Sequence, residues 1–399
     1  MNNNPQTRPT IRLLPKRDGR VKAGHPWVYS NEIAVDAAAK AIPPGSVVNL
    51  VSAEDRGLGT AFFNPHTLIA ARLLSREPGL AIDNGFFLRK FRSALALRAR
   101  LYEAPFYRLV HAEADGLPAV IVDRMGDVLS VQLNAAGPAG AEAAIVAALT
   151  DSLHPTAIVL KNDSPARKLE GLEPEIRLAA GMIGDSVEIV ENGARFLVHP
   201  LEGQKTGWFY DQRDSRAFVA RFARDARVLD AYCYGGGFGV LAAFMGARSV
   251  LMLDRSQAAL DAAMESARLN HVADRCAVRR LDVFDALEAL RAEGQRFEIV
   301  IVDPPAFAKS RKEVPAALRG YRKLVRLAAT LAAPRGILFA ASCSHNVEPV
   351  PFGEAVAQGL ADAGRSGRIL RQAGAGPDHP IHPMLPESAY LKSLTLAVD

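Results

Sequence analysis

The sequence has little cysteine and no long apolar run. Its 399 residues include three cysteines, Cys233, Cys276 and Cys343, which are too few and too scattered for a disulfide framework. No CxxC spacing suggests a structural zinc, and we expect no metal site. The polar start, MNNNPQTRPT, lacks the apolar core of a signal peptide, and no stretch approaches the length of a membrane span. We therefore expect a cytoplasmic protein with no membrane partner.

Composition and length indicate a folded chain of several domains. Hydrophobic residues make up 49% and charged residues 23%, as in ordinary globular proteins rather than disordered ones. A chain of 399 residues exceeds what one hydrophobic core usually serves, so two or three domains are expected. The net charge of +5 favours a nucleic-acid partner only where the cations gather on one surface.

The order of apolar runs divides the chain into three parts. Residues 10–82 alternate short apolar runs with turn signals, which predicts a small β-rich domain. A helix is expected over 86–103, at the start of an α+β domain over 83–202. Over 203–399 apolar strands alternate with amphipathic helices, which predicts an α/β domain with a mostly parallel sheet covered on both faces. In such sheets ligands bind outside the carboxyl ends of the strands.

The first strand of this third domain runs into a glycine-rich loop. The glycines at 235, 236, 237 and 239 do not spell the GxGxxG of NAD-binding proteins, the main competing reading. Asp230 would repel a pyrophosphate but can hold an ammonium, which suits S-adenosylmethionine (SAM). Asp254, at the end of the next strand, stands where ribose hydroxyls would be bonded. The loop residues expected to contact SAM are Tyr232, Gly235, Gly237 and Gly239.

A third acid, Asp282, follows the strand over 278–281. It could accept a hydrogen bond from the adenine amino group of the cofactor. The alternative is that it only caps the following helix.

Two further loops predict where the substrate reacts. Asp303-Pro-Pro-Ala-Phe307 follows a buried strand, and its prolines stop that strand and stiffen the turn, so that Asp303 would lie beside the methyl group. The next strand ends in Ser342-Cys343-Ser344-His345. Carbon 5 of cytosine becomes nucleophilic only after a nucleophile adds to carbon 6, which a Cys343 thiolate could do. Asp303 could bond the base edge and favour that addition. The structural alternative for the Asp303 loop is that it only ends the strand. The alternative for Cys343 is that it is a buried core thiol, which is what we expect of Cys276.

A cluster of cations lies between these loops and predicts contacts to RNA phosphates. It is accompanied by Arg319 and one aromatic, Tyr321, although a solvated helix face would give the same pattern. The cations expected to bind RNA are Lys309, Arg311, Lys312, Arg322 and Lys323.

Together these motifs resemble the bacterial large-subunit ribosomal RNA cytosine-5 methyltransferases. The resemblance covers nearly the whole chain: residues 16–20 and 25–33, residues 111–118 and 122–124, and tail segments at 378–380 and 386–392. Its most specific part is residues 203–216, which resemble the family's segment before the glycine loop. It implies a PUA RNA-binding domain at 10–82, a central domain at 83–202 and a Rossmann-like SAM methyltransferase domain at 203–399.

For the site, the resemblance implies that Gln212 and Asp303 line the cofactor pocket, that Cys343 attacks the base and that Asp303 assists. The implied substrate is large-subunit (23S-type) rRNA, and a homodimer is a possible assembly. Many enzymes of the wider cytosine-5 group carry a second cysteine where this sequence has Ala306. Another base or water must then take the C5 proton, and His345 is only a guess for it.

Two alternatives remain open from the sequence. A related methyltransferase acting on a guanine nitrogen can share the Asp-Pro-Pro loop but needs no thiol, so Cys343 discriminates between the two. A catalytically inactive assembly factor with a PUA domain is the other, against which the intact acids and Cys343 argue.

Overall fold

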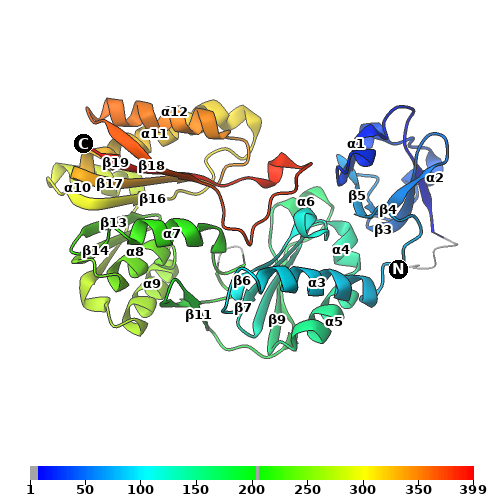
Figure 1. Ribbon diagram of the computed structural model, residues 1–399, viewed down its shortest axis with the longest axis horizontal. Helices are drawn as coiled ribbons and strands as arrows, with labels where there is room; N and C mark the ends of the chain where they lie inside the picture. The colour runs from blue at the N-terminus through cyan, green and yellow to red at the C-terminus, as the bar shows by residue number, and fades with distance from the viewer. Residues whose placement is uncertain (1–7, 204–205) are drawn as a thin grey trace. The chain divides into compact units, whose positions relative to one another are not determined.

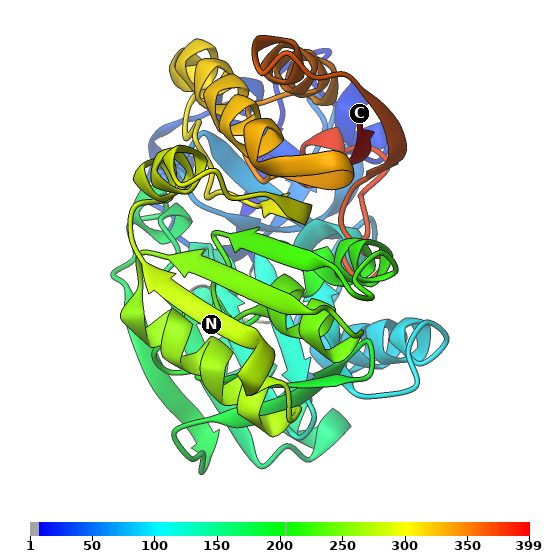
Figure 2. The same ribbon diagram turned by 90° about the vertical axis from the view of Figure 1, so that its left-hand side faces the viewer.

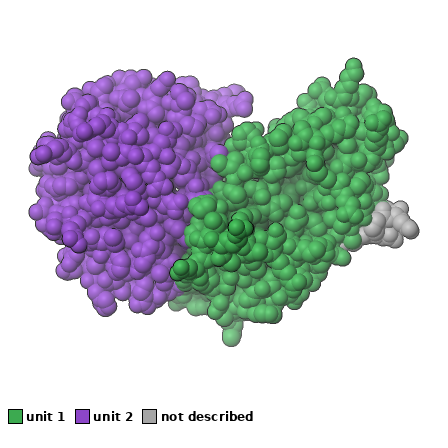
Figure 3. Space-filling view, in the orientation of Figure 1, with its two compact units in different colours: residues 1–187, 199–207, 377–388 green, residues 188–198, 208–376, 389–399 purple. Residues whose placement is uncertain are grey.

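The computed structural model describes residues 8–203 and 206–399, which form two compact units (Figure 3). The first unit holds residues 8–187, 199–203, 206–207 and 377–388, and the second holds 188–198, 208–376 and 389–399. Residues 1–7 of the polar start, and Gln204 and Lys205 of the 203–216 motif, lie outside the described residues.

The first unit opens with a five-stranded sheet in the order β1-β3-β4-β5-β2 (Figure 1). Only β1 runs parallel to its neighbour, β3, while the other pairs are antiparallel. Alternating apolar residues such as Val48, Leu50 and Ala61 fill the core of this sheet. Its elements are β1 (Thr10–Arg12), α1 (Gly19–Lys22), β2 (Trp27–Tyr29), α2 (Ala37–Lys40), β3 (Ser46–Val51), β4 (Gly57–Phe63) and β5 (Ile69–Ser75).

A second five-stranded sheet follows in the same unit, in the order β10-β9-β8-β7-β6. Residues of both sheets share one core, in which Val47, Phe62 and Leu74 pack with Phe86 and Phe87 of α3. The elements of this part are α3 (Asn84–Arg98), β6 (Phe106–His111), β7 (Val120–Met125), β8 (Val128–Leu133), α4 (Ala136–Gly140), α5 (Glu142–Leu153), β9 (Ala157–Asn162), α6 (Ala166–Leu169) and β10 (Glu175–Gly181).

Helix α3 is shorter than the sequence predicts. Asp83 caps it by accepting a hydrogen bond from the Phe86 amide, and it ends at Arg98 rather than at residue 103. Leu97 and Leu101 are 42% and 41% exposed, so no buried apolar face continues to residue 103. The extension to residue 103 was therefore wrong.

The second unit is built on a seven-stranded sheet in the order β15-β14-β13-β16-β17-β19-β18. Its first five strands are parallel, as Figure 2 shows for β13 to β15. Strand β19 pairs antiparallel with both of its neighbours, β17 and β18. Helices α11 and α12 cover one face and α8 and α9 the other (Figure 1), which confirms the predicted α/β fold. A two-stranded sheet of β11 (Val187–Glu191) and β12 (Ala194–Val198) precedes it. The other elements are α7 (Arg213–Ala220), β13 (Arg227–Ala231), α8 (Gly237–Phe244), β14 (Ser249–Asp254), α9 (Gln257–Leu269), β15 (Cys276–Arg280), α10 (Val283–Ala292), β16 (Phe297–Val302), α11 (Val314–Leu331), β17 (Ala332–Ser342), α12 (Pro349–Asp362), β18 (Gly367–Ala373) and β19 (Lys392–Val398).

Helix α11 is amphipathic, with Arg319, Arg322 and Lys323 on its polar side and Leu324 and Val325 buried. Within the described ranges no helix is both long enough and apolar enough to cross a membrane. The division into three domains at 10–82, 83–202 and 203–399 stays a prediction.

Candidate active site

Four parallel strands of the second unit end at one edge of the sheet. The register pairs Ala231 of β13 with Leu253 of β14 and Val302 of β16, and Val302 in turn with Ala340 of β17. The loops that follow these strands therefore start at the same level, and they carry the acids and the thiol that the sequence singles out. This edge is the candidate active site.

The glycine loop after β13 has a strained backbone. Tyr232 and Tyr234 both adopt left-handed conformations (φ 66° and 49°), which non-glycine residues adopt rarely and mostly where function or surrounding structure requires it. At Gly237 a Cβ atom would lie 2.5 Å from Nε of Arg216, which stacks on Trp208. Part of the glycine requirement thus comes from packing against the chain's own side chains, a cause the sequence analysis did not foresee.

Asp230 holds an unsatisfied oxygen at the base of this loop. Its Oδ2 accepts a hydrogen bond from the Gly239 amide at 2.8 Å, while its Oδ1 is buried with no hydrogen-bond partner in the described part of the chain. Burial, together with repulsion from Asp303 and Asp254, raises the pKa of Asp230 to about 7. The hydrogen bond from Gly239 and the charge of Arg216 act in the opposite direction and lower it. A buried carboxylate oxygen without a donor is a suitable acceptor for an ammonium group, so this residue fits the amino end of SAM.

Asp254 and Asp282 behave differently at their strand ends. Asp254 is half-buried, and its two oxygens accept backbone hydrogen bonds from Tyr234 (3.0 Å) and Ser256 (2.9 Å), which fixes the carboxylate beside the glycine loop. Asp282 is exposed and caps α10 by accepting from the Phe284 amide. The capping alternative for Asp282 is therefore present in the structure, and its contact to adenine stays a proposal.

Asp303 is tied to the segment before the glycine loop. Buried Gln212 donates from Nε2 to Asp303 Oδ2 at 3.0 Å, and Gln212 Oε1 is a second buried oxygen with no partner among the described residues. The structure thus brings together two residues that lie 91 positions apart and that the sequence placed in one pocket.

Cys343 lies beside the same loop. Its Sγ is 3.9 Å from the carbonyl oxygen of Pro304, and the side chain is half-buried. The two loops are joined by a hydrogen bond from the Ala308 amide to Ser344 Oγ. Cys276 is half-buried at the start of β15, and burial raises the pKa of its thiol to about 11, as expected for a thiol without a role in the reaction.

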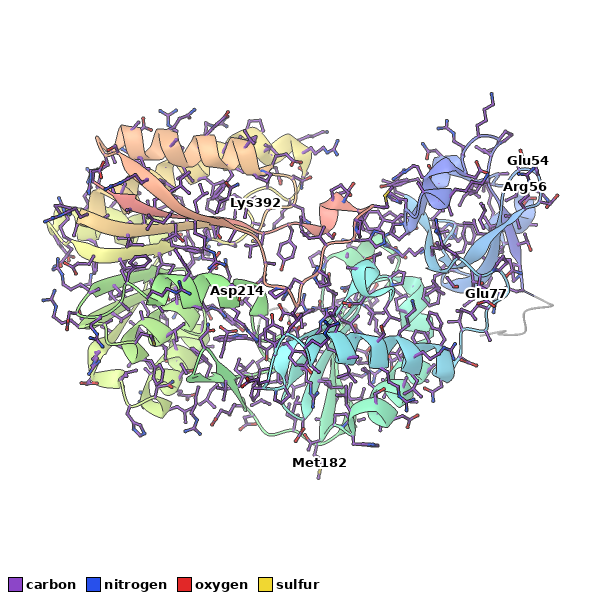
Figure 4. All side chains as sticks on the ribbon, viewed as in Figure 1. Glu54, Arg56, Glu77, Met182, Asp214 and Lys392 are labelled. Atoms are coloured by element: carbon purple, nitrogen blue, oxygen red, sulfur yellow. The ribbon has the colours of Figure 1, made fainter. Side chains whose placement is uncertain are left out.

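Two residues that the sequence analysis assigned no such role hold the Cys343 turn. The buried Tyr321 hydroxyl accepts from Ser342 Oγ at 2.8 Å and lies 3.0 Å from Ser344 Oγ, so it bridges both neighbours of the cysteine. Lys392, labelled in Figure 4 at the start of β19, donates from Nζ to the Ser344 carbonyl at 2.6 Å and to the Tyr390 carbonyl at 2.9 Å. The ammonium is thus buried next to the thiol-bearing turn.

The cation cluster divides into two groups. Lys309, Arg311 and Lys312 are exposed directly after the Asp303 loop. Arg322 instead pairs with Asp362 of α12 at 2.6 Å, and Lys323 pairs with Glu288 of α10 at 3.3 Å. The reading of Tyr321 as an aromatic of this RNA surface was wrong, because the helical period turns its ring into the core, where it is 1% exposed.

Comparison with known proteins identifies the family. A model of S-adenosylmethionine-dependent methyltransferases matches residues 175–370, and a PUA-like domain model matches residues 11–76. Proteins named ribosomal RNA large subunit methyltransferase I are 37% identical in Pseudoalteromonas atlantica (97% of this chain, 99% of the relative) and 36% in Vibrio cholerae (98% and 99%). The chain belongs to this methyltransferase I family.

Solved structures agree with the fold of the methyltransferase I family. A SAM-dependent methyltransferase from Streptococcus mutans has a TM-score of 0.81 at 22% identity, and covers 98% of this chain and 100% of its own. A methyltransferase complexed with SAH, the demethylated form of SAM, has a TM-score of 0.82 at 22% identity, with 98% and 99% covered. The two family models confirm the expected SAM cofactor and the expected PUA-like domain, whereas the relatives' names specify neither a base nor an atom.

The pKa of Asp230 predicts how SAM binding depends on pH. Without SAM the carboxyl titrates at about 7, and only the ionised form attracts an ammonium. Affinity should therefore be about half of its maximum near pH 7, where half of the carboxyl is ionised, and its fall should approach tenfold per unit as pH drops toward about 5. Calorimetric titration at several pH values is the measurement. Asp230→Asn should bind weakly with a flatter pH dependence, and a wild-type affinity that is constant over this range would remove Asp230 from the site.

Proposed function

We propose that this methyltransferase modifies carbon 5 of a cytosine in large-subunit ribosomal RNA, through a covalent bond between Cys343 Sγ and carbon 6 of the base. The observation that carries the proposal is the position of Cys343, at the carboxyl end of β17 and 3.9 Å from the loop that follows Asp303. A methyltransferase acting on a guanine nitrogen has no use for a thiol there. The names of the relatives support large-subunit rRNA as the substrate.

The reaction that follows from this geometry has four steps. The Cys343 thiolate adds to carbon 6, and the electron pair of the C5–C6 double bond makes carbon 5 nucleophilic. Bound SAM would supply the methyl group: carbon 5 would form a bond to it as the bond between the methyl and the sulfonium sulfur breaks, with SAH as the leaving group. A base or water takes the C5 proton, the sulfur–carbon bond breaks, and the double bond and thiolate are restored. Ala306, where the wider group has a second cysteine, provides no thiol for the proton transfer.

Asp303 is proposed to hold the base edge during the addition. The hydrogen bond from the Gln212 side-chain amide fixes the orientation of the Asp303 carboxylate. Asp303 can then accept a hydrogen bond from the cytosine amino group or share a proton with N3. A proton shared with N3 draws electron density from the ring and favours attack at carbon 6, whereas the contact to the amino group orients the base.

Lys392 and Tyr321 are proposed to position and activate the thiol. A cation within a few ångströms of the turn favours the thiolate over the neutral thiol, because the buried site screens charge less than water does. Burial lowers the pKa of Lys392, while Cys343 and Glu348 act in the opposite direction. The Tyr321 hydroxyl, bonded to both flanking serines, limits where the sulfur can lie.

The remaining site assignments are part of the same proposal. Asp254 would bond the SAM ribose, and Asp230 its ammonium. The loop residues Tyr232, Gly235, Gly237 and Gly239 would line the cofactor pocket. Exposed Lys309, Arg311 and Lys312 would contact RNA phosphates, with weaker contributions from the already paired Arg322 and Lys323.

Bisulfite sequencing of large-subunit rRNA tests the proposed product. RNA from cells lacking the protein should lose protection at one cytosine, and incubation of that RNA with the purified protein and SAM should restore it. Methyl transfer to rRNA without any protected cytosine would reject carbon 5 as the target.

A further inference from the structure

The first unit contains a cavity of about 650 Å³ that the proposed reaction does not use. It opens between the end of β5 and the start of α3. Its lining residues come from the parts of the first unit that contain its two five-stranded sheets. The charged residues of its wall are Arg76, Glu77, Arg89, Lys90 and Glu113. Figure 4 labels Glu77 at this part of the unit.

Lys90 is a half-buried cation without a counter-ion. Its Nζ lies 5.7 Å from the centre of the Phe86 ring and so close to Gly116 that a Cβ there would be 2.6 Å away. No ion pair or hydrogen bond of this ammonium is formed with the residues that the structure describes. Burial lowers the pKa of Lys90, and no carboxylate opposes the shift. Removing the Lys90 charge from water without a partner costs free energy, and a bound anion would offset this desolvation penalty.

The acids of the wall do not supply that anion. Glu113 is already engaged, because it accepts from Trp27 Nε1 at 2.7 Å and pairs with Arg72 at 3.2 Å. Arg76 is held by the carbonyl of Lys22 at 2.5 Å, and Arg89 is exposed on the same helix as Lys90. The wall thus has three cations and two acids, Glu77 and Glu113, and Glu113 is partly neutralised by Arg72, which also pairs with Glu170, so the cavity carries a net positive charge.

We propose that this cavity binds a backbone phosphate of the RNA substrate, with Lys90 and Arg89 as its ligands and Arg76 as a fixed neighbouring charge. This inference rests on the proposed RNA methyltransferase function. Residues 73–76, which lie within the PUA-like match over residues 11–76, form one wall of the cavity, and a phosphate contact there would add affinity without reading the base.

Charge-neutral variants of the full chain test the inference. The pair Lys90→Gln and Arg89→Gln should be compared with Arg92→Gln, an exposed residue of the same helix that does not line the cavity. Filter binding of an rRNA fragment from about 50 to 200 mM potassium chloride is the measurement. Loss of one phosphate contact lowers the slope of log affinity against log salt by about 0.7 to 0.9, so the double variant, which removes both ligands of that phosphate, should lose about this amount of slope and bind roughly tenfold more weakly. Arg92→Gln should match the wild type.

Stability separates this role from a folding defect. Because the Lys90 ammonium is desolvated and unpaired, Lys90→Gln should unfold at a temperature no lower than the wild type while binding RNA more weakly. An unchanged salt slope in the double variant, or an equal loss in Arg92→Gln, would overturn the proposal. If inorganic phosphate raises the unfolding temperature of the wild type but not of Lys90→Gln, and RNA affinity is unchanged, the cavity binds a free phosphate and the RNA assignment is wrong.

A third readout distinguishes failure here from failure of the proposed function. At saturating RNA the double variant should methylate at the wild-type rate, since the cavity is not part of the reacting site. A chain that binds RNA with the predicted slopes but transfers no methyl group would contradict the reaction and leave the phosphate site standing.

Discussion

Replacement of Cys343 by alanine is expected to abolish methyl transfer to rRNA while leaving SAM affinity unchanged. The thiol is the nucleophile in the proposed route, and no other thiol can replace it: Cys233 is buried within the glycine loop, and Cys276 lies at β15 with a raised pKa. Loss of a covalent nucleophile should cost at least on the order of 10³-fold in turnover. A single-turnover assay with labelled SAM, and calorimetry for SAM binding, are the measurements.

Cys276→Ala is the matched control and should behave like the wild type. The result that contradicts the route is a Cys343→Ala protein that methylates rRNA at a near-normal rate. In that case the thiol is a packing residue, and modification of a guanine nitrogen becomes the better account of the Asp303 loop.

Removal of the Lys392 charge is expected to have the next largest effect. Lys392→Met keeps much of the side-chain volume but removes the cation beside the Ser344 carbonyl. Alkylation of Cys343 by iodoacetamide near neutral pH should slow by roughly 10- to 100-fold, because the thiolate loses an interaction of about 1.5 to 3 kcal/mol. The rate should recover as pH rises, and methyl transfer should decline in parallel.

The other cysteines provide internal controls for Lys392→Met. The alkylation rate of Cys276 should not change, and Cys233 should stay unreactive because it is 6% exposed; a reactive Cys233 would report unfolding. If Cys343 reacts equally fast in wild type and variant at every pH, Lys392 only supports the turn. Lys392→Arg should then be tested for the same result.

The sequence predicted the layout of the second unit closely because its signals are local. The alternation of apolar strands and amphipathic helices predicted over 203–399 is present, and the carboxyl ends of the strands carry Asp230, Asp254, Asp303 and Cys343 as expected. Parallel topology alone places such residues at one edge. Gln212 and Asp303, which the family resemblance assigns to one cofactor pocket, are joined by a hydrogen bond.

What the sequence could not provide depends on pairings between distant segments. Lys392 reaches the thiol turn because β19 runs antiparallel to β17 and sets Lys392 opposite Ser342, a register that no local pattern specifies. Tyr321 was misread because it stands within a run of charges, although helical spacing to Leu324 and Val325 already places it on the apolar face. The orphaned oxygen of Asp230 likewise requires three-dimensional burial.

The shared core of the two sheets in the first unit also changes how RNA binding should be tested. Deletion of residues 1–80 would uncover Phe86 and Phe87 of α3, which pack with Val47, Phe62 and Leu74. Point variants in the full chain, as for Lys90, therefore give the cleaner comparison.

Trapping of the covalent intermediate tests the central claim most directly. RNA that carries 5-fluorocytosine at the target can be attacked and methylated, but fluorine cannot leave as a proton does, so the Cys343 adduct cannot resolve. The wild-type protein and Cys276→Ala should form an RNA–protein adduct that survives denaturing electrophoresis and requires SAM, and Cys343→Ala should form none. An adduct that persists in Cys343→Ala, or no adduct in a wild-type protein that methylates unmodified RNA, would contradict the proposed mechanism.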